Sequence, residues 1–167
     1  AWAQVATARY PNIAEPWLRL AFMYRQQRDT TKGLLAIERY AQLLPDDRAG
    51  QYLHAIFLYD LGRNDSAIVY AAAAAQDSAN REQAGVILYN IGARAFQAAQ
   101  DTAAAARLHQ AEKLEMAISA LSRAQPIVSP ELAPRVALFL GYAQLLTVAA
   151  LDQQAEQNRA CAPAQAL

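Results

Sequence analysis

The chain has 167 residues, of which 54% are hydrophobic, and its 15 basic side chains balance 15 acidic ones. This length allows one compact domain or one short array of repeats, and the even charge argues against the basic surface that nucleic-acid-binding proteins carry. Alanine dominates the apolar residues, whereas glycine and proline number only 6 and 7. Because alanine has the highest helix propensity, the composition predicts an all-α protein.

Apolar residues recur with helical spacing along the chain. Trp17, Leu20 and Tyr24, for example, follow the i, i+3, i+7 rule for one face of a helix. Capping signals mark helix starts, with Asp29 before one helix and Ser129-Pro130 at the start of another. The sequence therefore predicts about nine helices, at residues 1–10, 14–28, 30–44, 48–62, 64–78, 82–99, 102–125, 130–149 and 151–161.

A period of 34 residues runs through the first half of the chain. Pro11 and Pro45 each close an amphipathic stretch and lie 34 positions apart, and the same spacing separates Gly33 from Ala67. A fixed period of this size indicates stacked units of supersecondary structure. Small residues are expected where paired helices approach most closely, and we assign these points to Ala21, Ala55, Gly92 and Gly141.

The repeated unit resembles the tetratricopeptide repeat, which has Trp, Leu, small and Tyr positions in its first helix and small and Pro positions later. The first complete unit carries Trp17, Leu20, Ala21, Tyr24, Gly33, Ile37 and Pro45. Later units match in shorter runs, at Leu61-Gly62, Asn90-Ile91-Gly92 and Leu140-Gly141. The resemblance covers nearly the whole chain and implies a right-handed α-α superhelix of helical hairpins. Residues 102–125 read as one unusually long helix, so we expect an elongated hairpin in the third unit.

The chain is then interpreted as a single helical-repeat domain over residues 1–167. Its parts are the second helix of an incomplete unit (1–12), repeat units at 14–47, 48–81 and 82–127, and a C-terminal unit and cap at 129–167.

The resemblance also implies a binding surface, because the first helix of each tetratricopeptide unit lines a concave groove. We predict that a protein partner (a peptide, a helix or a neighbouring subunit) contacts side chains at these places, namely Leu18, Phe22, Arg25, Tyr52, Ile56, Tyr59, Tyr89 and Phe96. Aromatic and arginine side chains are typical of binding hot spots. Two alternatives stay open: the groove is exposed, or its residues are covered by one another or by the helix expected at 102–125. Apolar Leu18, Phe22 and Leu53 argue against the polar carboxylate clamp of some family members.

The N-terminal edge is the second predicted contact surface. Residues 1–10 correspond to the second helix of a unit, because Pro11 stands where Pro45 stands one period later. A repeat helix of this kind is normally covered by the first helix of its own unit, so part of the surface of Trp2 and Val5 is expected to lack a partner within the chain. We predict that this edge contacts another polypeptide, either a longer native N-terminus or a neighbouring subunit.

Residues that could carry chemistry are few. His109 and Glu112 lie three positions apart on one expected helix, but no second pair of this kind completes a metal site. His54 stands among apolar residues, where a core or groove histidine is far more common than a ligand. Cys161 is the single cysteine and cannot form an intramolecular disulfide. Because the chain also has no phosphate-binding glycine loop or nucleophile motif, we expect no enzyme activity, no metal and no cofactor.

The most apolar stretch is Val136–Leu151, whose 16 residues include Gln144. A membrane-spanning helix needs roughly 20 apolar residues, so we expect a repeat helix buried on two sides and no direct transmembrane span. Only two of the 15 basic residues are lysine, Lys32 and Lys113. Together with the abundance of alanine, this points to a bacterial protein. Its compartment stays open between the cytoplasm and the periplasm or cell envelope, with a preference for the envelope.

These features together favour a protein–protein interaction scaffold or adaptor. An alternative is a structural subunit that assembles end to end into a larger complex or filament. A third, with His109 and Glu112 as its only support, is a metal-binding or enzyme accessory domain.

Overall fold

The computed structural model describes residues 2–100 and 109–161, with the backbone alone at residue 154 and residues 157–161. These residues form eight α-helices and no strand. The all-α class predicted from the sequence is therefore confirmed, whereas the count of about nine helices is not. The helices are α1 (Trp2–Arg9), α2 (Ala14–Gln26), α3 (Thr30–Leu43), α4 (Arg48–Asp60), α5 (Asn64–Ala74), α6 (Arg81–Ala99), α8 (Gln110–Ala124) and α9 (Ala133–Cys161).

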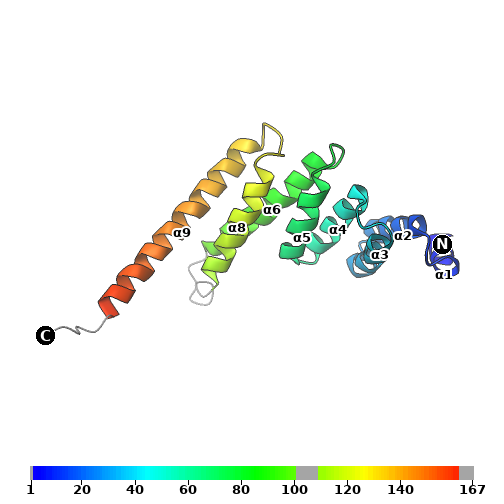
Figure 1. The fold of residues 1–167 in the computed structure, drawn as a ribbon, viewed down its shortest axis with the longest axis horizontal. Coiled ribbons are helices and arrows are strands. Elements are labelled where there is room, and N and C mark those ends of the chain that lie inside the picture. Colours follow the sequence, from blue (N-terminus) through cyan, green and yellow to red (C-terminus); the bar gives the residue numbers. More distant parts are fainter. Residues whose placement is uncertain (1, 101–108, 162–167) are drawn as a thin grey trace.

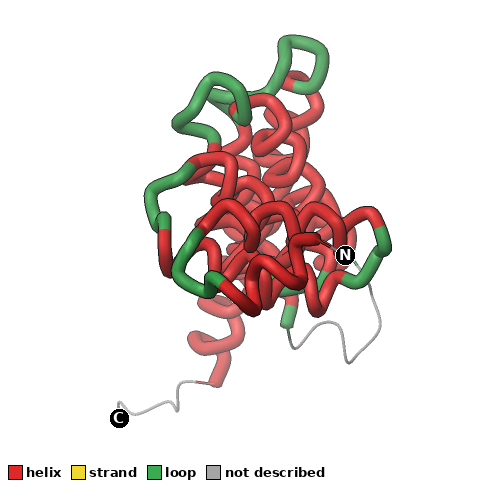
Figure 2. Tube along the Cα trace, turned by 90° about the vertical axis from the view of Figure 1, so that its right-hand side faces the viewer, coloured by secondary structure: helices red, strands yellow, loops and turns green. Residues whose placement is uncertain are grey.

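The helices pack as pairs that follow one another in a row (Figure 1). α2 packs against α3, α4 against α5 and α6 against α8, and contacts of α3 with α4, α5 with α6 and α8 with α9 join each pair to the next. α1 lies on α2 at one end of the row, and α9 lies on α8 at the other. Figure 2 looks along the row and shows the connecting loops at the periphery of the stacked helices.

The turns inside the first two pairs share one unusual backbone conformation. Arg28 follows α2 and Gly62 follows α4, and both have a positive φ, of 58° and 72°. A left-handed residue ends a helix, because the backbone can no longer continue the α-helical hydrogen bonds. The two helices therefore end at Gln26 and Asp60, each two residues before the predicted ends at 28 and 62.

The entry into each first helix repeats as well. The indole Nε1 of Trp17 donates a hydrogen bond to the carbonyl oxygen of Pro11 at 3.0 Å, and Nε2 of Gln51 donates one to the carbonyl oxygen of Pro45 at 2.9 Å. Each donor and each acceptor in the second unit lies 34 positions after its counterpart in the first. The sequence period thus corresponds to a repeated local geometry.

Aspartate side chains begin two of the helices. Asp29 caps α3 by accepting a hydrogen bond from the backbone N–H of Lys32, and Asp47 caps α4 by accepting one from the N–H of Gly50 at 2.6 Å. The Asp47 carboxylate also accepts a hydrogen bond from the hydroxyl of Tyr40 at 2.9 Å, which ties α3 to the start of α4. Burial and this carboxylate raise the pKa of Tyr40 to about 12.

Small residues lie where helices cross, as the sequence predicted at three of four positions. Ala21 and Ala55 are fully buried. A Cβ added at Gly92 of α6 would lie 2.5 Å from Cγ of Leu121 in α8, so only glycine fits this crossing. Gly141 of α9 differs, because a Cβ there would meet nothing within 4 Å. The prediction that Gly141 marks a close approach of two helices of this chain is wrong.

The third pair departs from the first two in its first helix. α6 has 19 residues, against 13 in both α2 and α4. α8 begins only at Gln110, and His109 lies in the turn before it, so an unbroken helix over 102–125 is wrong at that point. The part of that prediction covering residues 102–108 lies outside the described residues.

α9 is one helix of 29 residues, where the sequence analysis expected two helices with a break at residue 150. Ala149, Ala150 and Leu151 are strong helix formers, and no glycine or proline interrupts the helix there. α9 also begins at Ala133, not at Pro130, which lies in the preceding turn.

Candidate interaction surfaces

The structure divides the predicted groove residues into two groups. On α2, Phe22 and Arg25 are exposed and Leu18 is half-buried. On α4, Tyr52 and Tyr59 are half-buried. The remaining groove residues are buried, namely Ile56 of α4 and both Tyr89 and Phe96 of α6.

Helix α9 covers the α6 part of the predicted groove. The ring of Phe139 lies 6.1 Å from the ring of Tyr89 and 5.5 Å from that of Phe96, measured between centroids. Tyr142 lies 6.5 Å from Phe96 on the next turn of α9. The sequence analysis left open whether the groove is exposed or covered by other residues of the chain. In the third unit it is covered. The aromatic rings that contact Tyr89 and Phe96 come from α9, a helix that the sequence analysis did not expect to cover the groove.

The exposed part of the groove is confined to α2 and α4. The guanidinium carbon of Arg94, on α6, lies 4.9 Å from the ring centroid of Tyr59, so this ring already has a cation–π partner on one face. We name Leu18, Phe22, Arg25, Tyr52 and Tyr59 the open groove. Its members keep partly accessible apolar surface that a partner could bury.

The N-terminal edge carries Trp2, which has the highest exposed fraction among the large aromatic residues of the described chain. Trp2 is 68% exposed and Val5 is 64% exposed, both on α1. Two further apolar residues, Tyr10 and Ile13, lie exposed in the turn that follows, and sequence analysis did not select them. These four residues line a groove of about 470 Å³, together with Ala6, Arg9, Glu15 and Pro16. We call this groove the edge groove.

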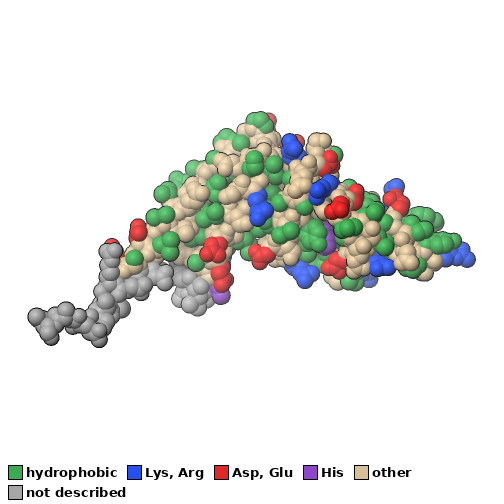
Figure 3. All heavy atoms as spheres, viewed as in Figure 1, with side chains coloured by type: hydrophobic (Ala, Val, Ile, Leu, Met, Phe, Trp, Pro, Cys, Tyr) green, Lys and Arg blue, Asp and Glu red, His purple; other side chains and the backbone are tan. Residues whose placement is uncertain are grey.

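A second apolar surface lies at the other end of the row. Val136, Leu140 and Ala143 of α9 are buried, and the opposite face of this helix is exposed. Figure 3 shows hydrophobic side chains along its outer edge. We call this surface the outer face, and its exposed large residues are Leu138, Leu145 and Val148. Tyr142 and Leu151 are also exposed, but Tyr142 contacts Phe96 and Leu151 lies in line with Leu140, on the packed side of the helix. The expectation that this stretch is buried on two sides is therefore wrong.

The apolar stretch of α9 is longer than the sequence analysis expected. Within Ala133–Gln153, the most apolar window of 18 residues has a mean hydropathy of 1.4, and only 17% of that window is buried. Among the described helices, this one alone is long and apolar enough to cross a membrane, by length and composition only. The sequence analysis did not consider the stretch at this length, because it expected one helix to end at residue 149 and another to begin at residue 151.

The residues considered for chemistry do not assemble into a metal centre. Nδ1 of His109 lies 3.0 Å from a carboxylate oxygen of Glu112, so these exposed side chains contact each other. Within the described ranges, no three His, Cys, Asp or Glu side chains gather closely enough to hold a metal ion. The side chain of Cys161 lies outside the described residues.

His54 is buried, as expected for a core or groove histidine. Its ring stacks on that of Tyr70 with centroids 3.9 Å apart, and its Nδ1 has no hydrogen-bond partner among the residues that the structure describes. Burial, and then the positive charge of Arg63, lower the pKa of His54 to about 4. The imidazole is therefore neutral near pH 7.

Comparison of the chain with protein-family models, with curated proteins and with solved structures finds no match.

Proposed function

We propose that this chain is a tetratricopeptide-like scaffold that binds a partner polypeptide through the edge groove and the open groove. The 34-residue period supports the repeat assignment, because it recurs in the turns at Arg28 and Gly62 and in the Trp17 and Gln51 hydrogen bonds. On this proposal the helix pairs form a right-handed superhelix. No residue is assigned a catalytic role.

The observation that carries the proposal is the exposed apolar surface of the edge groove. Trp2, Val5, Tyr10 and Ile13 are all more than half exposed and line one groove. Scattered single apolar residues are normal on protein surfaces, but a contiguous apolar patch marks an interaction site. Tryptophan and tyrosine are also among the residues most enriched in binding hot spots.

The open groove adds residues of the same kind on α2 and α4. Phe22 and Arg25 are exposed, while Tyr52 and Tyr59 keep part of their surface accessible. An aromatic surface beside the exposed guanidinium of Arg25 suits an amphipathic helix or an extended peptide carrying an acidic residue. We therefore expect a partner of this kind.

Affinity capture with edge-groove variants tests the proposal. Trp2→Ser and Val5→Ser should each reduce capture of the partner from native cells while leaving the helical content unchanged. Val69→Ser on α5 is the matched control, because Val69 is 62% exposed and Val5 is 64% exposed, but Val69 lies outside the edge groove. A photo-crosslinking amino acid at position 2 should then form a covalent bond with the same partner.

The open groove has a separate test. Tyr52→Ala combined with Tyr59→Ala should weaken capture of that crosslinked partner. Equal capture by the edge-groove variants and the Val69→Ser control would refute the role of the edge groove. Unchanged capture by the double tyrosine variant would confine binding to the edge.

The outer face of α9 favours a second candidate, a subunit that assembles end to end. The edge groove and the outer face lie at opposite ends of the row, and both are apolar (Figure 1). A contact between two different surfaces of one molecule is heterologous, and repeated contacts of this kind build rings or filaments. In this candidate the edge groove of one copy receives the outer face of the next.

Mixing two variants separates this candidate from the first. Trp2→Ser disables one end and Leu145→Glu disables the other, so neither variant should assemble alone in light scattering across concentrations. An equimolar mixture should form dimers and nothing larger. Each dimer joins the intact edge groove of one variant to the intact outer face of the other, and both remaining ends are disabled. A native protein that stays monomeric at all concentrations excludes self-assembly and leaves the scaffold proposal intact.

A further inference from the structure

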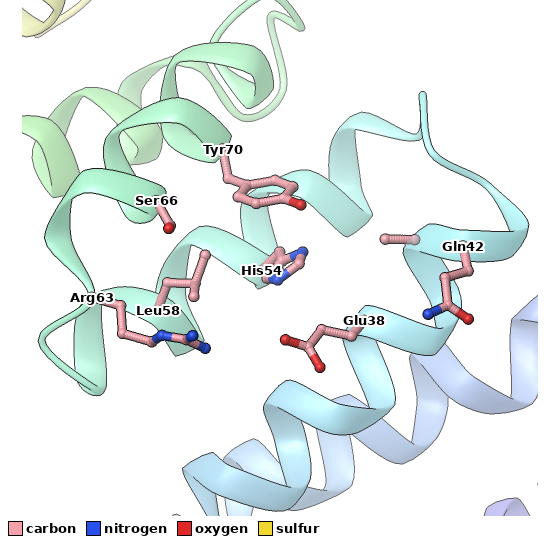
Figure 4. A pocket seen from close by; sticks show the side chains of 8 residues that line it. Glu38, Gln42, His54, Leu58, Arg63, Ser66 and Tyr70 are labelled. Carbon is pink, nitrogen blue, oxygen red and sulfur yellow. The ribbon is translucent and has the colours of Figure 1, made fainter.

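A polar pocket of about 420 Å³ lies between α3, α4 and the start of α5 (Figure 4). None of the open-groove or edge-groove residues lines it. Its lining side chains come from three elements and belong to Glu38, Ala41, Gln42, His54, Leu58, Arg63, Ser66 and Tyr70. This volume is typical of small-molecule sites, which range from roughly 300 to 1,000 Å³.

The pocket has a buried polar group without a partner. His54 is only 4% exposed, and its Nδ1 makes no hydrogen bond to the rest of the described chain. Buried polar atoms are almost always hydrogen-bonded, so an unpartnered one inside a pocket calls for an explanation. In Figure 4 the ring lies beneath Tyr70, between Arg63 and Gln42.

Two opposite charges face this pocket without pairing with each other. Glu38 of α3 and Arg63 at the start of α5 both line it. The ion pairs of the described residues involve other side chains, and neither Glu38 nor Arg63 has a side-chain hydrogen bond among them. The pocket therefore offers one carboxylate and one guanidinium without a partner among the described residues, together with a neutral imidazole.

We propose that this pocket binds a small zwitterionic molecule of the amino-acid class, whose ammonium group pairs with Glu38 and whose carboxylate pairs with Arg63. A purely anionic ligand would be repelled by Glu38, and a purely cationic one by Arg63. A zwitterion satisfies both charges at once, and a guanidinium can hold a carboxylate through two parallel hydrogen bonds. Leu58 and Ala41 supply apolar surface for the carbon atoms of the ligand. The hydroxyl groups of Ser66 and Tyr70 are available to its remaining polar atoms, and the ring of His54 forms part of the pocket wall.

The two histidines of the chain provide the readout. His54 lines the pocket, whereas His109 is exposed and belongs to the turn before α8. Each free amino acid of the standard set is added at millimolar concentration to the native protein, and the imidazole proton signals are followed by NMR. We expect at least one amino acid to shift the His54 signal in a saturable way, while the His109 signal stays in place.

Modified ligands and pocket variants test the two charge pairs. N-acetylation of the bound amino acid removes its positive charge, and amidation removes its negative charge. Each change should weaken binding by about tenfold to a hundredfold, the loss expected for one charged hydrogen bond. Glu38→Gln and Arg63→Gln should lower the affinity by similar factors, whereas Arg19→Gln, which removes an exposed charge on α2, should not. Circular dichroism confirms that each variant is folded.

Three results would overturn the proposal. The first is a His54 signal that no amino acid shifts. The second is an acetylated or amidated form that binds as tightly as the unmodified amino acid, which would show that the pocket does not recognise both charges of the ligand. The third is a folded Glu38→Gln variant that binds the zwitterion as tightly as the native protein.

Discussion

Arg28 and Gly62 occupy the same place in two successive helix pairs, 34 positions apart, and both adopt a left-handed backbone conformation. Only one of them is a glycine. A left-handed φ places Cβ of an L-residue too close to the following carbonyl oxygen, which costs roughly 1–2 kcal/mol, and glycine avoids this cost. The first turn is therefore strained where the second is not.

Arg28→Gly should relieve this strain and raise the free energy of unfolding by up to about 1 kcal/mol. The reciprocal change, Gly62→Ala, introduces the strain at a site where an added Cβ meets no neighbour, so backbone conformation alone determines its effect. It should lower the free energy of unfolding by about 1 kcal/mol. Chemical denaturation measures both. Opposite signs support the shared turn geometry, and equal signs contradict it.

Gly92 and Gly141 form a second matched pair, both in the interior of a helix. Gly92→Ala forces a methyl group against Leu121 and should destabilise the protein by roughly 1–3 kcal/mol, the usual cost of overpacking. Gly141→Ala meets open space and should stabilise α9 by about 0.5–1 kcal/mol, because alanine is the better helix former. Thermal unfolding of the two variants would contradict this assignment if both melted below the native protein.

The sequence allowed the local features to be predicted better than the distant contacts. Asp29 begins its helix as predicted, because a cap depends on residues only three positions away. The burial of Tyr89 and Phe96 depends on Phe139, which lies more than 40 positions further along the chain. The resemblance to the tetratricopeptide repeat assigned these two aromatic residues to the groove-lining face of their helix. It could not indicate that α9 packs against that face.

The pocket at His54 was missed for a related reason. Glu38 lies on α3, His54 on α4 and Arg63 in the turn before α5, and no motif in the sequence joins them. The apolar neighbours of His54 in sequence correctly indicated burial, but not which polar groups surround the imidazole. Only the packing of α3 against α4 and α5 brings the three side chains to one pocket.

Phe139→Ala tests the packing of α9 on α6. The substitution removes a ring that contacts both Tyr89 and Phe96, so it should destabilise the protein by roughly 2–4 kcal/mol, less than the full cost at a completely buried site. Leu138→Ala on the neighbouring exposed position should change stability by less than about 0.5 kcal/mol. Hydrogen exchange would also show faster exchange in α9 of the Phe139→Ala variant. Equal stability of the two variants would mean that α9 does not depend on this contact.

His54 should make the protein sensitive to acid. In the unfolded chain its pKa is near 6.5, whereas burial, and then the charge of Arg63, lower its pKa to about 4 in the folded protein. Above pH 6.5 the imidazole is neutral in both states, so its contribution to stability is fully present. Between pH 6.5 and 4 only the unfolded chain takes up the proton, and this contribution is lost as the pH falls.

The size of this effect follows from proton linkage. A depression of this magnitude lowers the free energy of unfolding by about 2 kcal/mol between pH 7.5 and pH 5. His54→Phe keeps an aromatic ring against Tyr70 but cannot bind a proton, so it should lack this part of the pH dependence. Glu38, which lines the same pocket, is present in both proteins, so the comparison isolates the contribution of the imidazole. Urea denaturation at the two pH values measures the difference. If the native protein and the variant lost the same free energy on acidification, the imidazole of His54 would have to titrate freely, and its burial against Tyr70 would be wrong.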